Sequence, residues 1–159
     1  MKFYFIYISL FLCAVSCKKE KPDTDIELLK KYMILPVKPE MVKYEITEKK
    51  LRTGSQDCNK LLGIVGILKF SRNDFNIVAE NLKRKKKYDI ELSLNDDFYK
   101  DWYPSEIKNM FTREKYGLTN HKITSIYSGD FFKDKNKDGN ILCFITDNNE
   151  VIIKIGYCE

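Results

Sequence analysis

Aromatic rings and carboxylates are concentrated in residues 96–103, where they could form a ligand-binding surface. Rings offer flat apolar area, and carboxylates can fix the orientation of a bound sugar or peptide. Core packing explains the same rings at least as well, because the single tryptophan of a domain is commonly buried. The sequence therefore gives a candidate ligand site, with core packing as the favoured alternative, at Tyr99, Trp102, Tyr103, Asp97 and Asp101.

A run of positive charges follows an amphipathic segment and comprises Lys83, Arg84, Lys85, Lys86 and Lys87. At a helix C-terminus each cation interacts favourably with the helix dipole, by about 0.3–1 kcal/mol, and this structural role is the favoured one. The alternative is contact with anionic lipid head groups or with an acidic partner.

A polar stretch over residues 134–140 resembles the first half of an EF-hand calcium loop, with oxygen ligands at Asp134, Asn136 and Asp138. The twelfth position, where a bidentate Glu would complete such a loop, holds Ile145. Two interspersed lysines also lower the negative potential. A solvated hairpin loop is therefore the favoured interpretation. We predict no cofactor, with calcium as the alternative.

Motifs for catalysis are absent from the chain. His121 is the single histidine, and no evident thiol or hydroxyl partner accompanies it, so the sequence contains no triad and no histidine metal cluster. The GxSxG, HExxH, CxxC, P-loop and GxGxxG patterns do not occur. Carboxylates could still act in pairs, as they do in glycosidases, but spacing in the sequence does not show this.

The N-terminus has the pattern of an export signal. After Lys2, residues 3–15 contain no charged side chain. This run is too short to cross a bilayer, which takes about 20 helical residues, but it fits the apolar part of a secretory signal. It ends in Ala14-Val15-Ser16-Cys17, which resembles the lipobox of bacterial lipoproteins, although Ala14 stands where the family more often has Leu. Cys13 is a poorer candidate, because the bulky Leu12 precedes it.

The resemblance implies that Cys17 receives a diacylglycerol and becomes the first residue after cleavage. The two or three acyl chains usual in the family would anchor the protein durably, since each buried methylene contributes about 0.8 kcal/mol. Lys18 stands where lipoproteins retained at the inner membrane of enteric bacteria usually carry Asp, which favours the outer membrane. The expected partners are the membrane, through the acyl chains, and an envelope protein or glycan.

The expected domain organisation is a signal peptide over residues 1–16, a lipidated tether over residues 17–24 and one domain over residues 25–159. The 43% hydrophobic and 13% aromatic content predicts a packed core rather than disorder. A net charge of +5 does not by itself indicate nucleic acid, and export argues further against it. Three cysteines follow Cys17. A disulfide from Cys58 to Cys143 or Cys158 and free buried thiols remain alternatives.

Hydrophobic periodicity predicts the elements of the first half. Thr24 and Glu27 form a capping box for a short helix through about Met33. Alternation over residues 42–46 predicts a half-buried strand, and the nearly all-apolar residues 61–70 predict a central strand rather than a buried helix. Residues 72–84 have one apolar stripe and predict a helix, followed by a strand over residues 88–94.

In the second half, a helix is predicted after Pro104. The chain then forms a predicted three-stranded meander over residues 123–132, 141–146 and 151–157. A two-residue turn at Asn148-Asn149 would place Cys143 opposite Lys154. Cys158 would then lie about 13 Å further along its strand, which is too far for a disulfide with Cys143.

The order of elements predicts an α+β fold, in which a mostly antiparallel sheet of about six strands has two or three helices packed on one face. The favoured function is a non-catalytic envelope domain that binds a protein or small ligand, such as an accessory or immunity-type inhibitor factor. A small envelope hydrolase that uses carboxylates and a structural envelope component are the alternatives. Paired carboxylates in a deep cleft would favour the hydrolase, and a shallow aromatic or apolar patch would favour binding.

Overall fold

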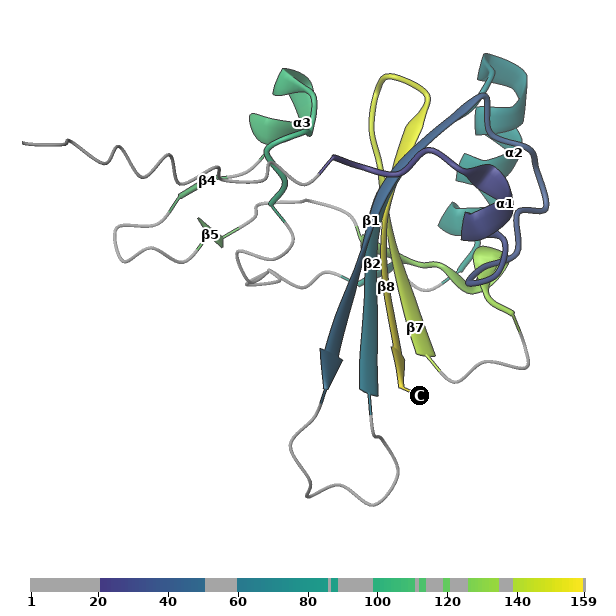
Figure 1. Cartoon of the computed structure of the whole chain (residues 1–159). Coiled ribbons are helices and arrows are strands. Elements are labelled where there is room, and N and C mark those ends of the chain that lie inside the picture. Colours follow the sequence, from purple (N-terminus) through teal and green to yellow (C-terminus); the bar gives the residue numbers. More distant parts are fainter. Residues whose placement is uncertain are drawn as a thin grey trace, which may run out of the picture.

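A computed structural model shows an α+β fold built on one antiparallel sheet (Figure 1). It describes residues 21–50, 60–85, 87–88, 99–110, 112–113, 119–120, 126–134 and 139–158. Within these residues the sheet is six-stranded, in the order β1-β2-β8-β7-β6-β3, and each neighbouring pair is antiparallel. The predicted class is confirmed, and the expected count of about six strands is reached only if the short β3 is included.

The long strands are β1 (Met41–Lys50), β2 (Lys60–Lys69), β7 (Gly139–Ile145) and β8 (Glu150–Cys158). The short strands β6 (Ile126–Ser128) and β3 (Lys87–Tyr88) extend the sheet beyond β7. A separate small ladder joins β4 (Thr112–Arg113) to β5 (Thr119–Asn120). The helical elements are α1 (Ile26–Leu29), α2 (Arg72–Lys83), α3 (Ser105–Lys108) and the 3-10 helix η2 (Asp130–Phe132).

One face of the sheet carries the larger core. Alternate residues of β1, β2, β7 and β8 point into it, and α1, α2 and η2 cover it. Figure 1 shows α1 and α2 together on this side of the strands. The predicted apolar stripe of α2 is confirmed, because Val78 and Leu82 are fully buried and Phe75 packs against the same cluster.

The opposite face carries a second, smaller core, in which Tyr103 and Ile107 cover Val65 and Ile67 of β2 together with apolar residues of β6, β7 and β8. The α3 segment thus lies across the sheet from α1 and α2, as Figure 1 also shows. The expectation of two or three helices packed on one face holds for α1 and α2 but is wrong for α3. The physical reason is that β2, β7 and β8 have apolar side chains in both alternating sets, so both faces need a cover.

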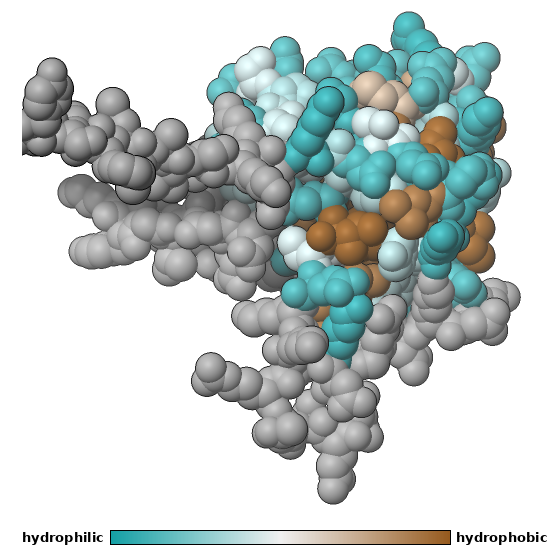
Figure 2. Space-filling view, viewed as in Figure 1, coloured by the Kyte–Doolittle hydropathy of each residue, from teal (hydrophilic) through white to brown (hydrophobic). Residues whose placement is uncertain are grey.

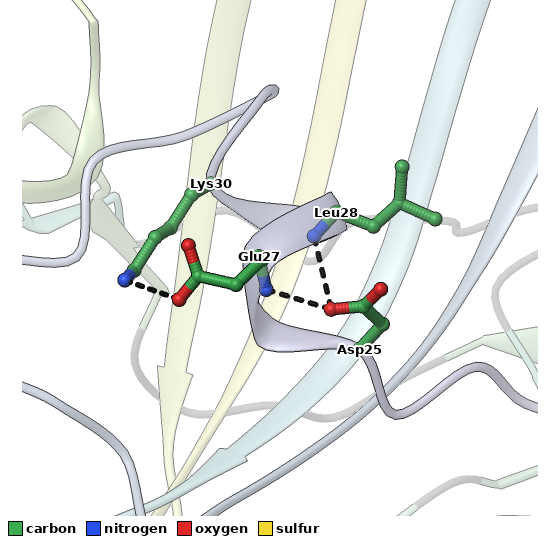
Figure 3. A network of polar contacts seen from close by, with 4 residues as sticks. All are labelled: Asp25, Glu27, Leu28 and Lys30. Carbon is green, nitrogen blue, oxygen red and sulfur yellow. Dashed lines mark hydrogen bonds and ion pairs between the residues drawn. The ribbon is translucent and has the colours of Figure 1, made fainter.

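The first helix is shorter than predicted, and its N-cap is Asp25 rather than Thr24. The Asp25 carboxylate accepts hydrogen bonds from the amides of Glu27 and Leu28, at 2.8 and 3.2 Å, as Figure 3 shows. Glu27 does not reach back as in a capping box; it pairs instead with Lys30 at 2.6 Å. A charged carboxylate satisfies the first amides of a helix and also interacts favourably with its dipole, which favours Asp25 as the cap.

The C-terminal strands β6, β7 and β8 are neighbours, but the first is shorter than the predicted strand over residues 123–132, because Asp130–Phe132 form η2. The chain bends at Gly129, whose amide donates to the carbonyl of Ile141 at 2.7 Å. A Cβ added to Gly129 would lie 2.3 Å from Cγ2 of Ile141. This close approach of the two strands requires glycine, and the strand ends there.

The last hairpin also differs from its prediction. Thr146 donates its amide to the carbonyl of Glu150, so the loop contains three residues, Asp147, Asn148 and Asn149, instead of two. Asn149 has a φ of 58°, the left-handed conformation with which such loops close. The register therefore pairs Cys143 with Ile153, not with Lys154.

This geometry gives a prediction for Asn149. Replacing Asn149 with Val should lower the free energy of unfolding by about 1–2 kcal/mol, because a β-branched residue is strained at positive φ. Asn149→Gly should be neutral or slightly stabilising. Urea denaturation measures both, with Asn148→Val as the matched control in the same loop. Equal losses in Asn148→Val and Asn149→Val would contradict the role of the left-handed residue.

Candidate functional site

The aromatic residues predicted as a ligand platform lie against the second face of the sheet. Tyr103 is 3% exposed and belongs to the second core, while Trp102 is half-buried and packs against that core. Their rings meet edge to face, with centroids 4.7 Å apart and planes at 79°. Tyr99 is half-buried and Asp101 is exposed, whereas Asp97 lies outside the described residues. The Trp102 and Tyr103 rings thus serve core packing, the alternative that the sequence favoured.

A largely buried ion pair joins the segment of residues 99–103 to β1. The Nζ atom of Lys100 lies 2.5 Å from Oε1 of Glu45, and the two side chains are 12% and 13% exposed. Nε1 of Trp102 donates to Oε2 of the same carboxylate at 3.3 Å. Burial, with the nearby Glu45 charge, raises the pKa of the Tyr103 hydroxyl above its usual range. Glu45 and Lys100 could not be recognised as a pair from the sequence, because they are far apart in the chain.

The basic run begins at the end of α2, where Lys83, Arg84 and Lys85 are exposed. Lys86 and the side chain of Lys87 lie outside the described residues. Lys83 occupies the last turn of the helix and Arg84 is the C-cap residue, which is the placement that the dipole argument requires. Contact with an anionic surface stays a prediction.

Of the three predicted calcium ligands, the structure describes Asp134 only, since Asn136 and Asp138 fall in a gap. Among the described residues, no group of three or more His, Cys, Asp or Glu side chains is placed to hold a metal ion. His121 also lies outside these residues. The calcium hypothesis therefore stays a prediction.

Cys143 is a free, fully buried thiol in the larger core. Burial raises its pKa, and the charge of Asp130 acts in the same direction. Of the alternatives left open by the sequence, the structure thus has Cys143 as a free buried thiol and not in a disulfide with Cys58. Cys58 and the side chain of Cys158 are not among the described parts of the chain.

A hollow of about 470 Å³ opens on the sheet next to the second core. Its lining comes from β2, β7 and β8 and comprises Leu61, Gly139, Asn140, Leu142, Lys154, Gly156 and Tyr157. Gly156 pairs with Gly63 on one side and Asn140 on the other. A Cβ added at Gly156 would have no atom within 4 Å, so the space above this backbone is open.

The described surface has few exposed hydrophobic side chains, and one of them lines the hollow. Figure 2, in the view of Figure 1, shows small hydrophobic patches among mostly hydrophilic side chains. Within the described residues, the exposed large hydrophobic side chains are Ile34, Leu61 and Ile77, and of these Leu61 lines the hollow at 40% exposure. The volume and the mainly apolar lining with few polar groups are typical of small-molecule sites. We name this site the Gly156 hollow.

The Gly156 hollow was not among the sites predicted from the sequence. The available signal was Gly156 itself, which interrupts the apolar strand Val151–Tyr157 and removes a side chain from its second face. A glycine within a strand often marks close approach of another group. The sequence could not show that Gly156 lies opposite Gly63, because that depends on the register of β2 against β8.

A second hollow, of about 560 Å³, runs along the outer edge of β1, and three carboxylates are found among its described lining residues. Glu45 pairs with Lys100, and Glu48 pairs with Lys60 at 2.8 Å. Asp23 accepts the amide of Asp25 at 2.9 Å. Each carboxylate in this hollow therefore has a partner within the fold.

Comparison of the chain with protein-family models, with curated proteins and with solved structures finds no match. Within the described parts of the chain, no helix has the length and apolar character that crossing a membrane would require.

The ion pair between Glu45 and Lys100 gives a stability prediction. Lys100→Met should cost about 2–3 kcal/mol, because it leaves the Glu45 carboxylate buried without its cation. The double variant Glu45→Gln/Lys100→Met should recover at least half of this loss. Urea unfolding measures both variants. Lys30→Met is the control, since its pair with Glu27 is exposed and should contribute less than about 0.5 kcal/mol. Equal losses in Lys30→Met and Lys100→Met would contradict the prediction.

Proposed function

We propose that the protein is a lipid-anchored domain of the bacterial envelope that binds a small ligand in the Gly156 hollow without transforming it. One observation carries the binding proposal. Next to the second core of the sheet, the backbone of Gly156 forms the open floor of a hollow of about 470 Å³. This volume lies in the range of small-molecule sites, and the open side of the hollow would leave one side of a bound molecule in contact with solvent.

The charges of the hollows favour binding over hydrolysis. A glycosidase-type mechanism needs two carboxylates that flank the reacting bond, one of them as the proton donor. Among the described residues, those that line the Gly156 hollow include no carboxylate. The carboxylates of the hollow beside β1 are engaged with Lys100, with Lys60 and with the amide of Asp25.

The anchor proposal rests on the sequence. The uncharged run over residues 3–15 and the small Ser16 before Cys17 support lipidation at Cys17. Lys18 supports the outer membrane as the destination. On such a domain, a ligand site would be exposed to molecules of the envelope, and we propose that the ligand of the hollow is one of them.

The anchor gives a prediction for Cys17. In the native host, Cys17→Ala should move the protein from the membrane fraction to the soluble fraction and abolish incorporation of labelled palmitate. Cys13→Ala is the matched control and should change neither result. Unchanged palmitate labelling in Cys17→Ala would contradict lipidation at this residue.

The hollow gives a prediction for Gly156. Gly156→Leu should weaken binding of the neutral dye Nile red at least tenfold, because a Cβ at this position meets no atom within 4 Å and the rest of the side chain would occupy the hollow. Fluorescence titration measures the affinity, and thermal unfolding checks that the variant is folded. Ile77→Ser is the control, since it removes an exposed apolar side chain of α2 and should leave the affinity unchanged. Absence of saturable dye binding to the unmodified protein would remove the proposed function.

A further inference from the structure

The floor of the Gly156 hollow is flat backbone. Gly156 of β8 pairs with Gly63 of β2 on one side and with Asn140 of β7 on the other. Because β8 has a partner strand on both sides, its amides and carbonyls are engaged in the ladders, and the floor presents the faces of peptide groups. Thr47 covers Gly63, since a Cβ added at Gly63 would lie 2.8 Å from the Thr47 hydroxyl oxygen. The bare floor is therefore centred on Gly156.

The bare floor is nearly as wide as it is long. Leu61 and Leu142 bound it at levels that are four residues apart on β8, which corresponds to about 13 Å. Across the strands, Asn140 and Gly63 are separated by two strand spacings, or about 10 Å. These proportions fit a fused ring better than an extended chain, because a flat ring contacts a flat floor with every atom of one face.

The Asn140 carboxamide is the uncharged polar side chain that the hollow offers to a ligand. Asn140 faces the same side of the sheet as Gly156, lines the hollow and is exposed. Within the described residues, no hydrogen bond engages its side chain. A carboxamide holds a donor and an acceptor side by side in one plane, so it can pair with a ligand edge that carries an acceptor next to a donor.

The lining does not favour a charged ligand. Among the described residues that line the hollow there is no carboxylate, and the basic side chain, Lys154, already has an interaction partner. A ligand ion would therefore lose hydration without gaining a free counter-charge. An uncharged ligand loses less hydration and buries apolar area against Leu61 and Leu142.

We infer that the Gly156 hollow binds a flat, uncharged fused ring that stacks over Gly156 and pairs one edge with the carboxamide of Asn140. This inference rests on the proposed function and adds the chemical class of the ligand. The ligand edge carries an N–H next to a carbonyl, which is the arrangement of a ring amide.

The test uses the full chain with Cys17→Ser, which carries no acyl chain, and lumiflavin, an uncharged fluorescent fused ring with such an edge. The matched probe is lumiflavin methylated at the N–H between its carbonyls, since it keeps the rings and loses the donor. Quenching of the fluorescence measures both affinities. Lumiflavin should bind about fivefold more tightly than the methylated probe, because the methyl group removes one hydrogen bond. Gly156→Leu should abolish saturable binding of both probes, because its side chain would occupy the hollow.

Variants of Asn140 separate the inference from the proposed function. Asn140→Leu nearly keeps the size of the side chain and should reduce the preference for lumiflavin to nearly one, while both probes and Nile red still bind. Asn140→Gln keeps a carboxamide and should retain part of the preference. Asn76→Leu is the matched control, since Asn76 is exposed on α2, and it should leave the preference unchanged. Thermal unfolding checks that each variant is folded.

The possible outcomes distinguish the two proposals. Saturable binding of Nile red without binding of lumiflavin, equal affinities for lumiflavin and the methylated probe, or a preference unchanged in Asn140→Leu would overturn the inference and leave the proposed function intact. Absence of saturable binding of both Nile red and lumiflavin would overturn both. A dimer in light scattering that Gly156→Leu dissociates would mean that a second copy of the chain fills the hollow, and it would also overturn the inference.

Discussion

The structure depends on a sheet whose central strands are apolar on both faces. In β2, β7 and β8, one set of alternating side chains enters the larger core and the other set enters the smaller core. Such strands cannot leave either face in water, because the exposed apolar area would be too costly. The chain therefore needs α1, α2 and η2 on one side and the α3 segment on the other.

The second cover depends on polar anchoring as well as on apolar packing. Tyr103 and Ile107 supply the apolar contacts, but the segment that precedes them is attached to β1 through Lys100, Trp102 and Glu45. The ion pair fixes where the segment attaches to β1, because the Lys100 ammonium group and the Glu45 carboxylate, 2.5 Å apart, must face each other. Beyond this cover, Gly156 leaves β8 without a side chain on the face of the smaller core, and the open hollow begins there.

Much of the fold could be predicted from the sequence because it follows from local patterns. The period-2 alternation around Tyr44, the apolar run of β2 and the stripe of α2 each define an element by themselves. The class followed from the order of these elements. The helix cap at Asp25 was missed, since Thr24 and Asp25 are both good caps and the choice depends on how the preceding residues pack.

The remainder required information that a local pattern does not contain. Residues 61–70 and 151–157 showed apolar strands, but only their partners decide which set of side chains faces which core. The register of β8 shows this point: with the predicted two-residue turn, Cys143 would share a level with Lys154, whereas the observed loop pairs it with Ile153. The candidate site was missed for the same reason, because the residues around Gly156 are set by the pairing of β8 with β2 and β7.

The first described residues have a mechanical consequence for the domain. Asp23 exchanges two backbone hydrogen bonds with Tyr44, at 2.8 and 3.0 Å, and the Tyr44 hydroxyl donates to the carbonyl of Asp25 at 2.9 Å. Any tension applied to the chain before residue 21 therefore reaches the edge strand through these few bonds. Under tension we expect these hydrogen bonds of Tyr44 to break before the strand pairs of the sheet do.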